Sequence, residues 1–253
     1  MDVCTIQYLS IAWILIAIFT FPVLLKVTQP YGRHTKKNWG PMIDNRLGWV
    51  IMEIPSLLIF GVLVLLGPGD HSKPVWILFG LWTFHYINRS IVFPLRTRTH
   101  GKKMPVIIVI FAVIFNIVNA TLNGYWLGFV APPYPLGWLT DPRFIIGGII
   151  FVTGFYINQV SDRTLIGLRK GGKEGYFIPR GGLFNYISCP NFFGEMVEWT
   201  GFAMMAWNFP ALSFAVWTIA NLIPRAKDHH KWYNGYFRDE YPKSRKAVIP
   251  FVI

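Results

Sequence analysis

The chain has 253 residues, of which 53% are hydrophobic and only 14% are charged, against roughly 25% charged residues in an average soluble domain. This balance favours an integral membrane protein held in a lipid bilayer. The net charge of +12 would suit a nucleic-acid-binding protein, but the basic residues occupy short connections between long apolar runs, which argues against nucleic acid as a partner.

Apolar runs recur along the whole chain, and a membrane-crossing helix needs about 20 such residues. They predict an all-α, polytopic membrane protein with seven transmembrane helices, at Thr5–Val27, Leu47–Leu66, Pro74–Leu95, Met104–Val130, Arg143–Leu168, Asn191–Trp207 and Pro210–Pro224. The first run has no basic region before it, so we expect a retained helix, not a signal peptide. The basic tail Arg225–Ile253 follows the last run, and we expect a single membrane domain over 1–253 that acts as a monomer.

The basic residues are divided unequally between the two sides of the predicted membrane domain. Most lie in the first, third and fifth connections and in the tail, whereas the opposite connections hold essentially Lys73 and Arg143. The positive-inside rule therefore predicts an N-terminus outside and a C-terminus in the cytoplasm, in a bacterial inner membrane or the endoplasmic reticulum. The Gly-rich loop 169–182 then faces the cytoplasm, and we hypothesise that Gly171–Gly182 acts as a lid.

Polar residues gather in the stretch from Asn158 to Trp199. They form two sets, and within each set the spacing places the residues on one face of a helix. The Gly-rich loop, which contains Tyr176, connects the two sets. The first set is Asn158, Asp162 and Arg169, and the second is Asn191, Glu195 and Glu198. This arrangement predicts a site for an extended polar ligand at the membrane boundary.

Ionisable residues inside apolar runs are costly unless they are paired or face a wet cavity, so they mark functional sites. Glu53 has two interpretations: an ion pair with Arg89 that ties two helices together, or an acid held beside a catalytic partner. Tyr86, which shares a helical face with Arg89, is the natural partner because a tyrosine hydroxyl can donate a proton towards a developing oxyanion.

The start of the tail carries Arg225, His229 and Tyr233 at intervals of four residues. This helical face is typical either of an anchor to lipid headgroups or of a site for a phosphate-bearing aromatic ligand. The adjacent His229 and His230 do not have metal-ligand spacing, and Cys4 and Cys189 suggest no disulfide framework, so we expect no metal site. Neither GxGxxG nor a P-loop motif occurs. The residues alone thus indicate a membrane enzyme or transporter with a polar cavity open to the cytoplasm.

Motifs spread over the whole chain are similar to those of the steroid 5α-reductase family, the 3-oxo-5α-steroid 4-dehydrogenases. They are EIPS, HYINR, GWLTDPRF, NQVSDRTL, LFNYISCPNFFGEMVEW, RAKDHHKWY and YPKSRKAVIPF. The chain resembles a bacterial-type member of this family.

The resemblance implies NADPH-dependent reduction of the Δ4 double bond of a 3-oxo-Δ4-steroid to a 5α-3-oxosteroid, with hydride added to C5 and a proton to C4. It implies that Tyr86 and Glu53 are catalytic at the C3 carbonyl and that Trp49 lines the steroid site. It assigns residues 1–130 mainly to the substrate and 131–253 mainly to NADPH. The cofactor residues that it implies are Asn158, Asp162, Arg169, Tyr176, Asn191, Glu195, Arg225, His229 and Tyr233.

Three alternatives remain open on sequence grounds. A related membrane reductase could use the same cofactor half on a polyprenol, a sterol or an enoyl lipid. A membrane methyltransferase would place S-adenosylmethionine there instead. A transporter would use Glu53, Arg89 and Asp162 as an ion relay, but it would be expected to show an inverted repeat, and none is visible in the sequence.

Overall fold

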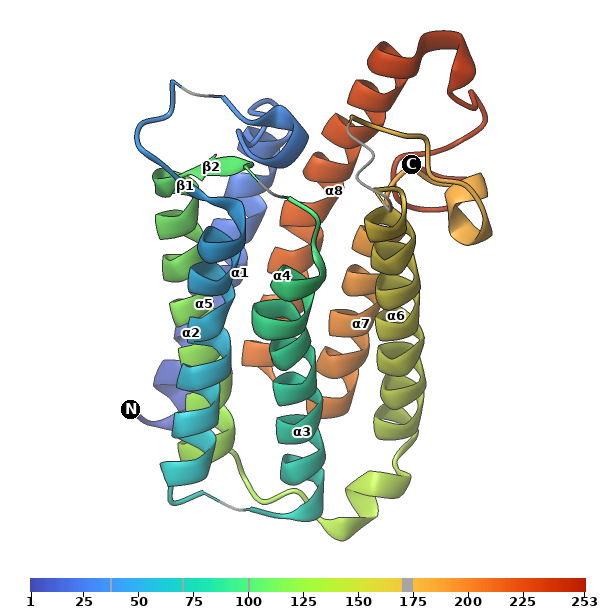
Figure 1. Cartoon of the computed structure of the whole chain (residues 1–253). Coiled ribbons are helices and arrows are strands. Elements are labelled where there is room, and N and C mark those ends of the chain that lie inside the picture. Colours follow the sequence, from blue (N-terminus) through green and yellow to red (C-terminus); the bar gives the residue numbers. More distant parts are fainter. Residues whose placement is uncertain (37, 70, 100, 170–174) are drawn as a thin grey trace.

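Long helices packed side by side make up most of the chain (Figure 1). The computed structural model describes residues 1–36, 38–69, 71–99, 101–169 and 175–253. The α-helices are α1 (Val3–Leu24), α2 (Asn45–Leu66), α3 (Lys73–Ile87), α4 (Phe93–Arg96), α5 (Val106–Tyr125), α6 (Pro142–Gly167), α7 (Pro190–Ala206) and α8 (Phe209–Phe237). The expectation of an all-α protein is confirmed for these residues, apart from the two short antiparallel strands β1 (Met42–Asp44) and β2 (Lys103–Pro105).

Four helical segments of the described chain are long and apolar enough to cross a membrane. They are Val3–Leu24, Asn45–Leu66, Val106–Val130 and Pro142–Gly167. The third of these is α5 continued by a π-helical turn at Trp126–Val130. A second π-helical turn at Asn88–Val92 joins α3 to α4, so that this segment is helical from Lys73 to Arg96. Seven membrane spans stay a prediction.

The last helix is longer than the apolar run that predicts it. The run ends at Pro224, but α8 continues through this proline to Phe237. A proline inside a helix removes one backbone hydrogen bond. Buried packing offsets that loss, because Leu222 and Ala226 on either side of Pro224 pack in one cluster with Cys189, Phe192 and Met196.

Glycines bring α6 and α7 into close contact along their length. A Cβ atom on Gly154 would lie 2.2 Å from the backbone nitrogen of Glu198, and one on Gly194 would lie 2.5 Å from that of Asn158. Gly147 and Gly201 make the same kind of approach. Small residues of this kind let membrane helices pack backbone against backbone. As a result, the polar faces of the two helices lie directly beside each other.

The helices also pair across large distances in sequence. α2 packs along α5, and α1 packs along α8. The indole nitrogen of Trp217 in α8 donates a hydrogen bond to the carbonyl oxygen of Trp13 in α1, 2.8 Å away. At the centre, the ring of Trp82 in α3 contacts Trp199 of α7 and Phe214 of α8. This aromatic core fixes the positions of the helices that carry the site.

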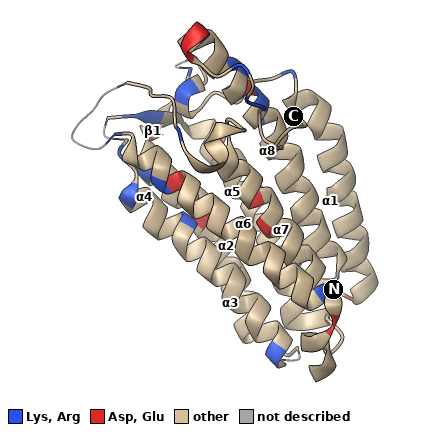
Figure 2. Ribbon diagram, turned by 90° about the vertical axis from the view of Figure 1, so that its right-hand side faces the viewer, with Lys and Arg blue, Asp and Glu red and all other residues tan. Residues whose placement is uncertain are grey.

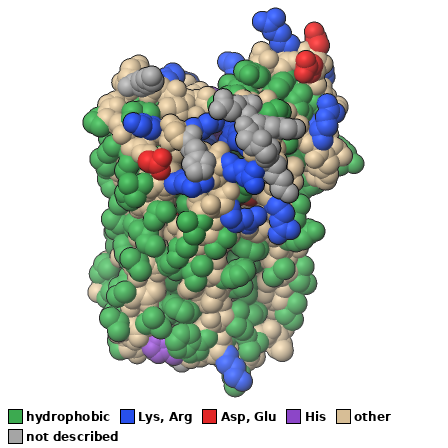
Figure 3. Space-filling model, viewed as in Figure 1, with side chains coloured by type: hydrophobic (Ala, Val, Ile, Leu, Met, Phe, Trp, Pro, Cys, Tyr) green, Lys and Arg blue, Asp and Glu red, His purple; other side chains and the backbone are tan. Residues whose placement is uncertain are grey.

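Charged residues gather at one end of the molecule. Figure 2 shows most lysines and arginines near β1 and the end of α8 that is remote from α7. Figure 3 shows hydrophobic side chains over the surface of the helices beyond that end. This distribution suits a protein with one polar end above an apolar belt. Residues 171–174 of the predicted lid lie outside the described part of the chain.

Candidate functional site

A cavity of about 760 Å³ lies among the helices. Its lining comes from α1, α2, α3, α5, α6, α7 and α8, and from the connection between α1 and α2. Its volume falls in the range of roughly 300–1,000 Å³ that is typical of ligand pockets. Every site residue named from the sequence lines this cavity except Asn158 and Glu198.

One part of the cavity is apolar and aromatic. Its walls include Trp13, Phe115, Phe214 and Trp217, contributed by α1, α5 and α8. The rings of Trp13 and Trp217 are 4.9 Å apart, and Phe115 meets Trp217 edge-on at 5.4 Å. Flat aromatic walls of this kind suit a rigid apolar ligand.

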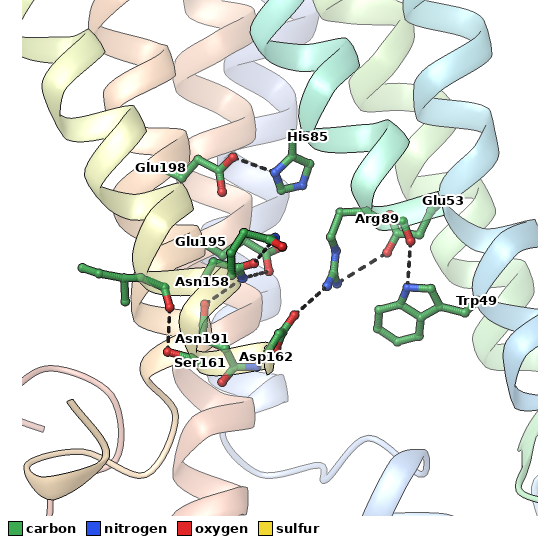
Figure 4. Close-up of polar contacts among 12 residues, drawn as sticks. Trp49, Glu53, His85, Arg89, Asn158, Ser161, Asp162, Asn191, Glu195 and Glu198 are labelled. Atoms are coloured by element: carbon green, nitrogen blue, oxygen red, sulfur yellow. Dashed lines mark hydrogen bonds and ion pairs between the residues drawn. The ribbon is translucent and has the colours of Figure 1, made fainter. Parts of the chain in front are cut away.

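Arg89 lines the cavity and lies between Glu53 of α2 and Asp162 of α6 (Figure 4). Its guanidinium lies 3.8 Å from Glu53 Oε1 of α2 and 3.7 Å from Asp162 Oδ2 of α6. It also stacks on the ring of Trp49, at 4.9 Å, and the Trp49 indole donates a hydrogen bond of 3.2 Å to the Arg89 carbonyl oxygen. Glu53 therefore pairs with Arg89 and lines the same cavity as Tyr86, and its catalytic role stays a prediction.

Amide and carboxylate side chains of α6 and α7 hold one another. Asn158 Nδ2 donates to the Asn191 carbonyl oxygen at 3.0 Å and lies 3.5 Å from Glu195 Oε2. Asn191 Nδ2 in turn donates to Asp162 Oδ1 at 3.2 Å. Asn158 is buried behind the cavity wall, so its role at a cofactor stays a prediction, while it directly orients Asn191 and Glu195.

The far end of α8 meets the connection between α1 and α2. The Arg225 guanidinium lies 3.9 Å from the centre of the Tyr31 ring, and Arg33 lies 4.3 Å from the centre of the Tyr233 ring. His229 Nδ1 and His34 Nε2 are 2.9 Å apart, at hydrogen-bond distance. The structure thus brings the face of Arg225, His229 and Tyr233 to the cavity, opposite residues from the first connection.

Both imidazoles of this pair lie outside the predicted membrane spans, His34 in the first connection and His229 after the last span. Burial and the neighbouring Arg33 hold the pKa of His34 below its usual 6.5. Burial, Arg33, Arg225 and His34 together hold the pKa of His229 well below that value. The pair is therefore neutral at pH 7, with one imidazole donating its N–H to the other.

Three cations lie around Tyr176, and no carboxylate of the described residues forms an ion pair with them. Arg33, Lys102 and Arg169 lie 6.0, 5.1 and 5.9 Å from the centre of the Tyr176 ring. Within the described residues, none of the three forms an ion pair. Burial, and after it the charges of Arg169 and Arg33, lower the pKa of Lys102. This combination of cations and aromatic faces suits an anionic aromatic ligand.

Sequence reasoning missed Tyr31, Arg33 and His34, of which the first two line the cavity and His34 contacts the lining residue His229; it also missed the lining residues His85 and Asn116. The first three occur in the motif PYGRHT, where an aromatic ring, a cation and an imidazole follow one another in a connection. That composition is the signal that could have identified them. Nothing in the sequence pairs His34 with His229, which lies 195 residues away.

Metal ligands and cysteine thiols are the other groups that could carry chemistry. Across the ranges that the structure describes, no group of three or more His, Cys, Asp or Glu residues is arranged to hold a metal ion. Cys4 is exposed and Cys189 is buried, and both are free thiols. The site therefore offers hydrogen-bond donors, carboxylates, cations and aromatic faces.

Comparisons with known proteins give a consistent result. The sequence model described as 3-oxo-5-alpha-steroid 4-dehydrogenase matches residues 102–253. The chain is 43% identical over 236 residues to the steroid 5-alpha-reductase DET2 of Arabidopsis thaliana, covering 91% of this chain and 90% of the relative. It is 43% identical over 237 residues to 3-oxo-5-alpha-steroid 4-dehydrogenase 1 of Bos taurus, covering 91% of each. It is 41% identical over 233 residues to 3-oxo-5-alpha-steroid 4-dehydrogenase 2 of Homo sapiens, covering 90% of each.

Proposed function

Because the chain belongs to the 3-oxo-5-alpha-steroid 4-dehydrogenase family, we propose that it reduces the Δ4 double bond of 3-oxo-Δ4-steroids to give 5α-3-oxosteroids. It is an oxidoreductase that acts on CH–CH groups, which argues against the methyltransferase and transporter alternatives. The bacterial-type assignment stays a prediction.

The observation that carries this proposal is one cavity with two chemically different parts. Aromatic walls from α1, α5 and α8 suit the flat hydrocarbon body of a steroid. The cations and aromatic rings around Tyr176 and Tyr233 suit a phosphate-bearing dinucleotide. Tyr86, Glu53 and Arg89 lie on the cavity wall, and Arg89 reaches from the α2 side to the α6 side.

The proposed chemistry at the substrate follows from the groups on the cavity wall. The Tyr86 hydroxyl donates a hydrogen bond to the C3 carbonyl oxygen, and negative charge builds on that oxygen as C5 is reduced. A donor aimed at such a charge stabilises the transition state. Glu53 lines the same region and is held by Arg89, so its position relative to Tyr86 is fixed. Hydride addition to C5 leaves an enolate, and addition of a proton from water to its C4 gives the saturated ketone and completes the reduction.

We propose NADPH as the cofactor, and when bound it supplies the hydride. The residues fit this group, because Arg33 Nη1 is buried without a hydrogen-bond partner among the described residues, beside uncompensated cations and open aromatic faces. Asp162, Asn191 and Glu195 would be the amide and carboxylate partners of its nicotinamide and ribose groups. Arg169, Tyr176, Arg225, His229 and Tyr233 would hold the phosphates and the adenine.

We propose that the chain crosses the membrane seven times, with the end rich in lysine and arginine in the cytoplasm. The helical segment from Lys73 to Arg96, α7 and the first half of α8 would be the three spans beyond those that length and hydropathy identify. The basic residues at one end support this orientation (Figure 3). The cofactor part of the cavity would then open towards the compartment that contains soluble NADPH.

The decisive experiment measures turnover of testosterone or progesterone with NADPH by the purified protein in detergent, with the product identified by mass spectrometry. We expect a gain of two hydrogens at the 4,5 double bond. Tyr86→Phe should lower kcat by about 10²–10³-fold, the usual effect of removing one oxyanion donor, while NADPH binding is retained. Tyr8→Phe, on an exposed face of α1, is the matched control. Saturable NADPH binding without turnover of any 3-oxo-Δ4-steroid would reject the proposed substrate.

A further inference from the structure

A buried acid–histidine pair lies beside Tyr86, and the chemistry proposed above does not use it. His85 Nδ1 of α3 and Glu198 Oε1 of α7 are 2.7 Å apart. Glu198 is 0% exposed and His85 is 2% exposed. The His85 ring packs edge-on against Trp199 at 4.6 Å and Tyr86 at 5.1 Å. In Figure 4 the two side chains point toward each other, and Glu195 lies between this pair and Asp162.

The surroundings limit where the protons of this pair can be. An uncompensated charge in such an apolar environment is costly, so the pair as a whole is neutral and carries two protons. Glu198 Oε2 is buried and has no hydrogen-bond partner among the described residues. A hydroxyl hydrogen there would have no acceptor, which is unfavourable. One proton therefore lies between Oε1 and Nδ1, and the other lies on Nε2 of His85.

This result holds for either distribution of charge within the pair. An imidazolium with a carboxylate has its second proton on Nε2, and so does a neutral imidazole that accepts from a protonated Glu198. His85 lines the cavity, and no described residue accepts a hydrogen bond from Nε2. Nε2 has no hydrogen-bond partner among the described residues, yet it is not fully enclosed by protein atoms. It therefore reaches open space. Glu198 thus turns the Nε2–H of His85 into a donor for whatever occupies the cavity.

We propose that His85 is a second hydrogen-bond donor at the reacting end of the cavity, directed at a carbonyl oxygen of a bound molecule, and that Glu198 is the positioning residue that fixes its tautomer. This inference rests on the proposed function, which supplies two such carbonyls: the C3 carbonyl of the steroid and the carboxamide carbonyl of the nicotinamide. A donor at either one orients the reactants before hydride transfer.

The competing explanation is purely structural, since the pair also ties α3 to α7. Two substitutions of His85 separate the explanations. In His85→Gln, the amide nitrogen takes the place of Nε2, so the cavity donor is kept and the contact with Glu198 is lost. In His85→Asn, the amide takes the place of Nδ1, so the contact with Glu198 is kept and the cavity donor is lost.

The experiment compares both full-length variants with the unchanged protein in detergent. We expect His85→Gln to turn over the steroid at least tenfold faster than His85→Asn, although His85→Asn has the higher thermal unfolding midpoint. Higher turnover in His85→Asn, or equal turnover in the two variants, would overturn the proposal. If His85→Gln does not fold, Glu198→Gln and Glu198→Met give the second comparison. The Gln amide can donate to Nδ1 and keep the proton on Nε2, whereas Met cannot, so turnover should be higher in Glu198→Gln. The reverse order would reject the assignment.

Two binding measurements, which need no turnover, identify the carbonyl. Hydrogen bonding to an enone carbonyl shifts its ultraviolet absorption to longer wavelength, so a smaller shift in His85→Asn than in His85→Gln assigns the donor to the steroid. A higher NADPH dissociation constant in His85→Asn, with the enone shift unchanged, assigns it to the carboxamide. No difference in either measurement would contradict the proposal. If the unchanged protein binds the enone and NADPH but does not reduce the enone, the proposed function fails while the role of His85 as a donor is still decided by these two measurements.

Discussion

The cations around Tyr176 predict a preference for NADPH over NADH, and substitution of one of them tests it. Arg33, Lys102 and Arg169 lie near its ring with no balancing carboxylate among the described residues. NADPH carries one more phosphate than NADH, and a charge-assisted hydrogen bond contributes about 1.5–3 kcal/mol. We therefore expect Arg169→Gln to raise the NADPH dissociation constant about tenfold to a hundredfold and to change that of NADH little.

Fluorescence titration of both cofactors measures this preference. Arg143→Gln is the matched control, because Arg143 pairs with Asp141 and does not line the cavity. A parallel loss of affinity for NADPH and NADH in Arg169→Gln would contradict the assignment of these cations to the additional phosphate.

The histidine pair at the far end of α8 predicts a dependence of stability on pH. His34 and His229 both have a pKa below the ordinary 6.5 of the unfolded chain. Below pH 6.5 the unfolded chain therefore binds more protons than the folded protein, and the free energy of unfolding decreases as the pH falls. Above pH 6.5 this contribution is fully present. Protonation adds charge beside Arg33 and Arg225, which is unfavourable without an anion.

Thermal unfolding of the purified protein between pH 5 and 8 checks this prediction. We expect the midpoint to fall as the pH drops through 6.5 and the fall to be smaller with saturating NADPH, whose phosphates would offset the added charge. His34→Gln, which leaves one imidazole to titrate instead of two, should reduce the slope. A midpoint independent of pH in this range would show that the pair does not control stability.

At the residue scale, the sequence identified the groups that are unusual in their own surroundings. Glu53 and Tyr86 were recognisable because ionisable and polar side chains inside apolar runs are costly. Tyr31 and His34 were not, because aromatic residues and histidines are ordinary in a polar connection. Their role depends on contacts with Arg225 and His229, nearly two hundred residues away in the chain.

At the scale of helices, the glycines between α6 and α7 predict a sharp difference between neighbouring substitutions. A Cβ on Gly154 would lie 2.2 Å from the Glu198 backbone, so Gly154→Ala must push the two helices apart. Overpacking of this kind typically costs about 1–3 kcal/mol, and we expect the unfolding midpoint to fall by several degrees.

Gly148→Ala is the control on the same helix. Its Cβ would meet nothing closer than the Met205 side chain at 3.8 Å. Alanine favours a helix over glycine by up to about 1 kcal/mol, so the midpoint should be unchanged or slightly higher. Equal effects of the two substitutions in a thermal melt would mean that α6 and α7 are not in backbone contact.

The sequence located helices better than it located their ends and partners. The predicted span Arg143–Leu168 agrees with α6 to within one residue at each end, because apolar composition marks the region that lies in lipid. The apolar run ends at Pro224, but α8 continues to Phe237, in agreement with the helical spacing of Arg225, His229 and Tyr233. Buried packing on both sides of Pro224 holds this continuation. The contact of Gly154 with Glu198 had no signal in the sequence, because close approach depends on which helices are neighbours.

At the scale of the whole molecule, the two cysteines allow a direct test of orientation. Cys4 is exposed at the start of α1, whereas Cys189 is buried. If the N-terminus lies outside, a membrane-impermeant maleimide added to spheroplasts that express the chain should label Cys4. Cys4→Ser should abolish the labelling. Labelling that requires lysis of the membrane would place the N-terminus inside and reverse the proposed orientation.

The pairing of α1 with α8 has a consequence for how the protein is made. A ribosome delivers α1 to the membrane first and α8 last, yet the two pack along each other, and Trp13 and Trp217 both form the cavity wall. Until translation is nearly complete, α1 lacks its partner and the cavity stays open on that side. The nascent chain therefore has no enclosed cavity for a ligand. Small molecules that bind the cavity stabilise the finished protein and not the shorter nascent chains.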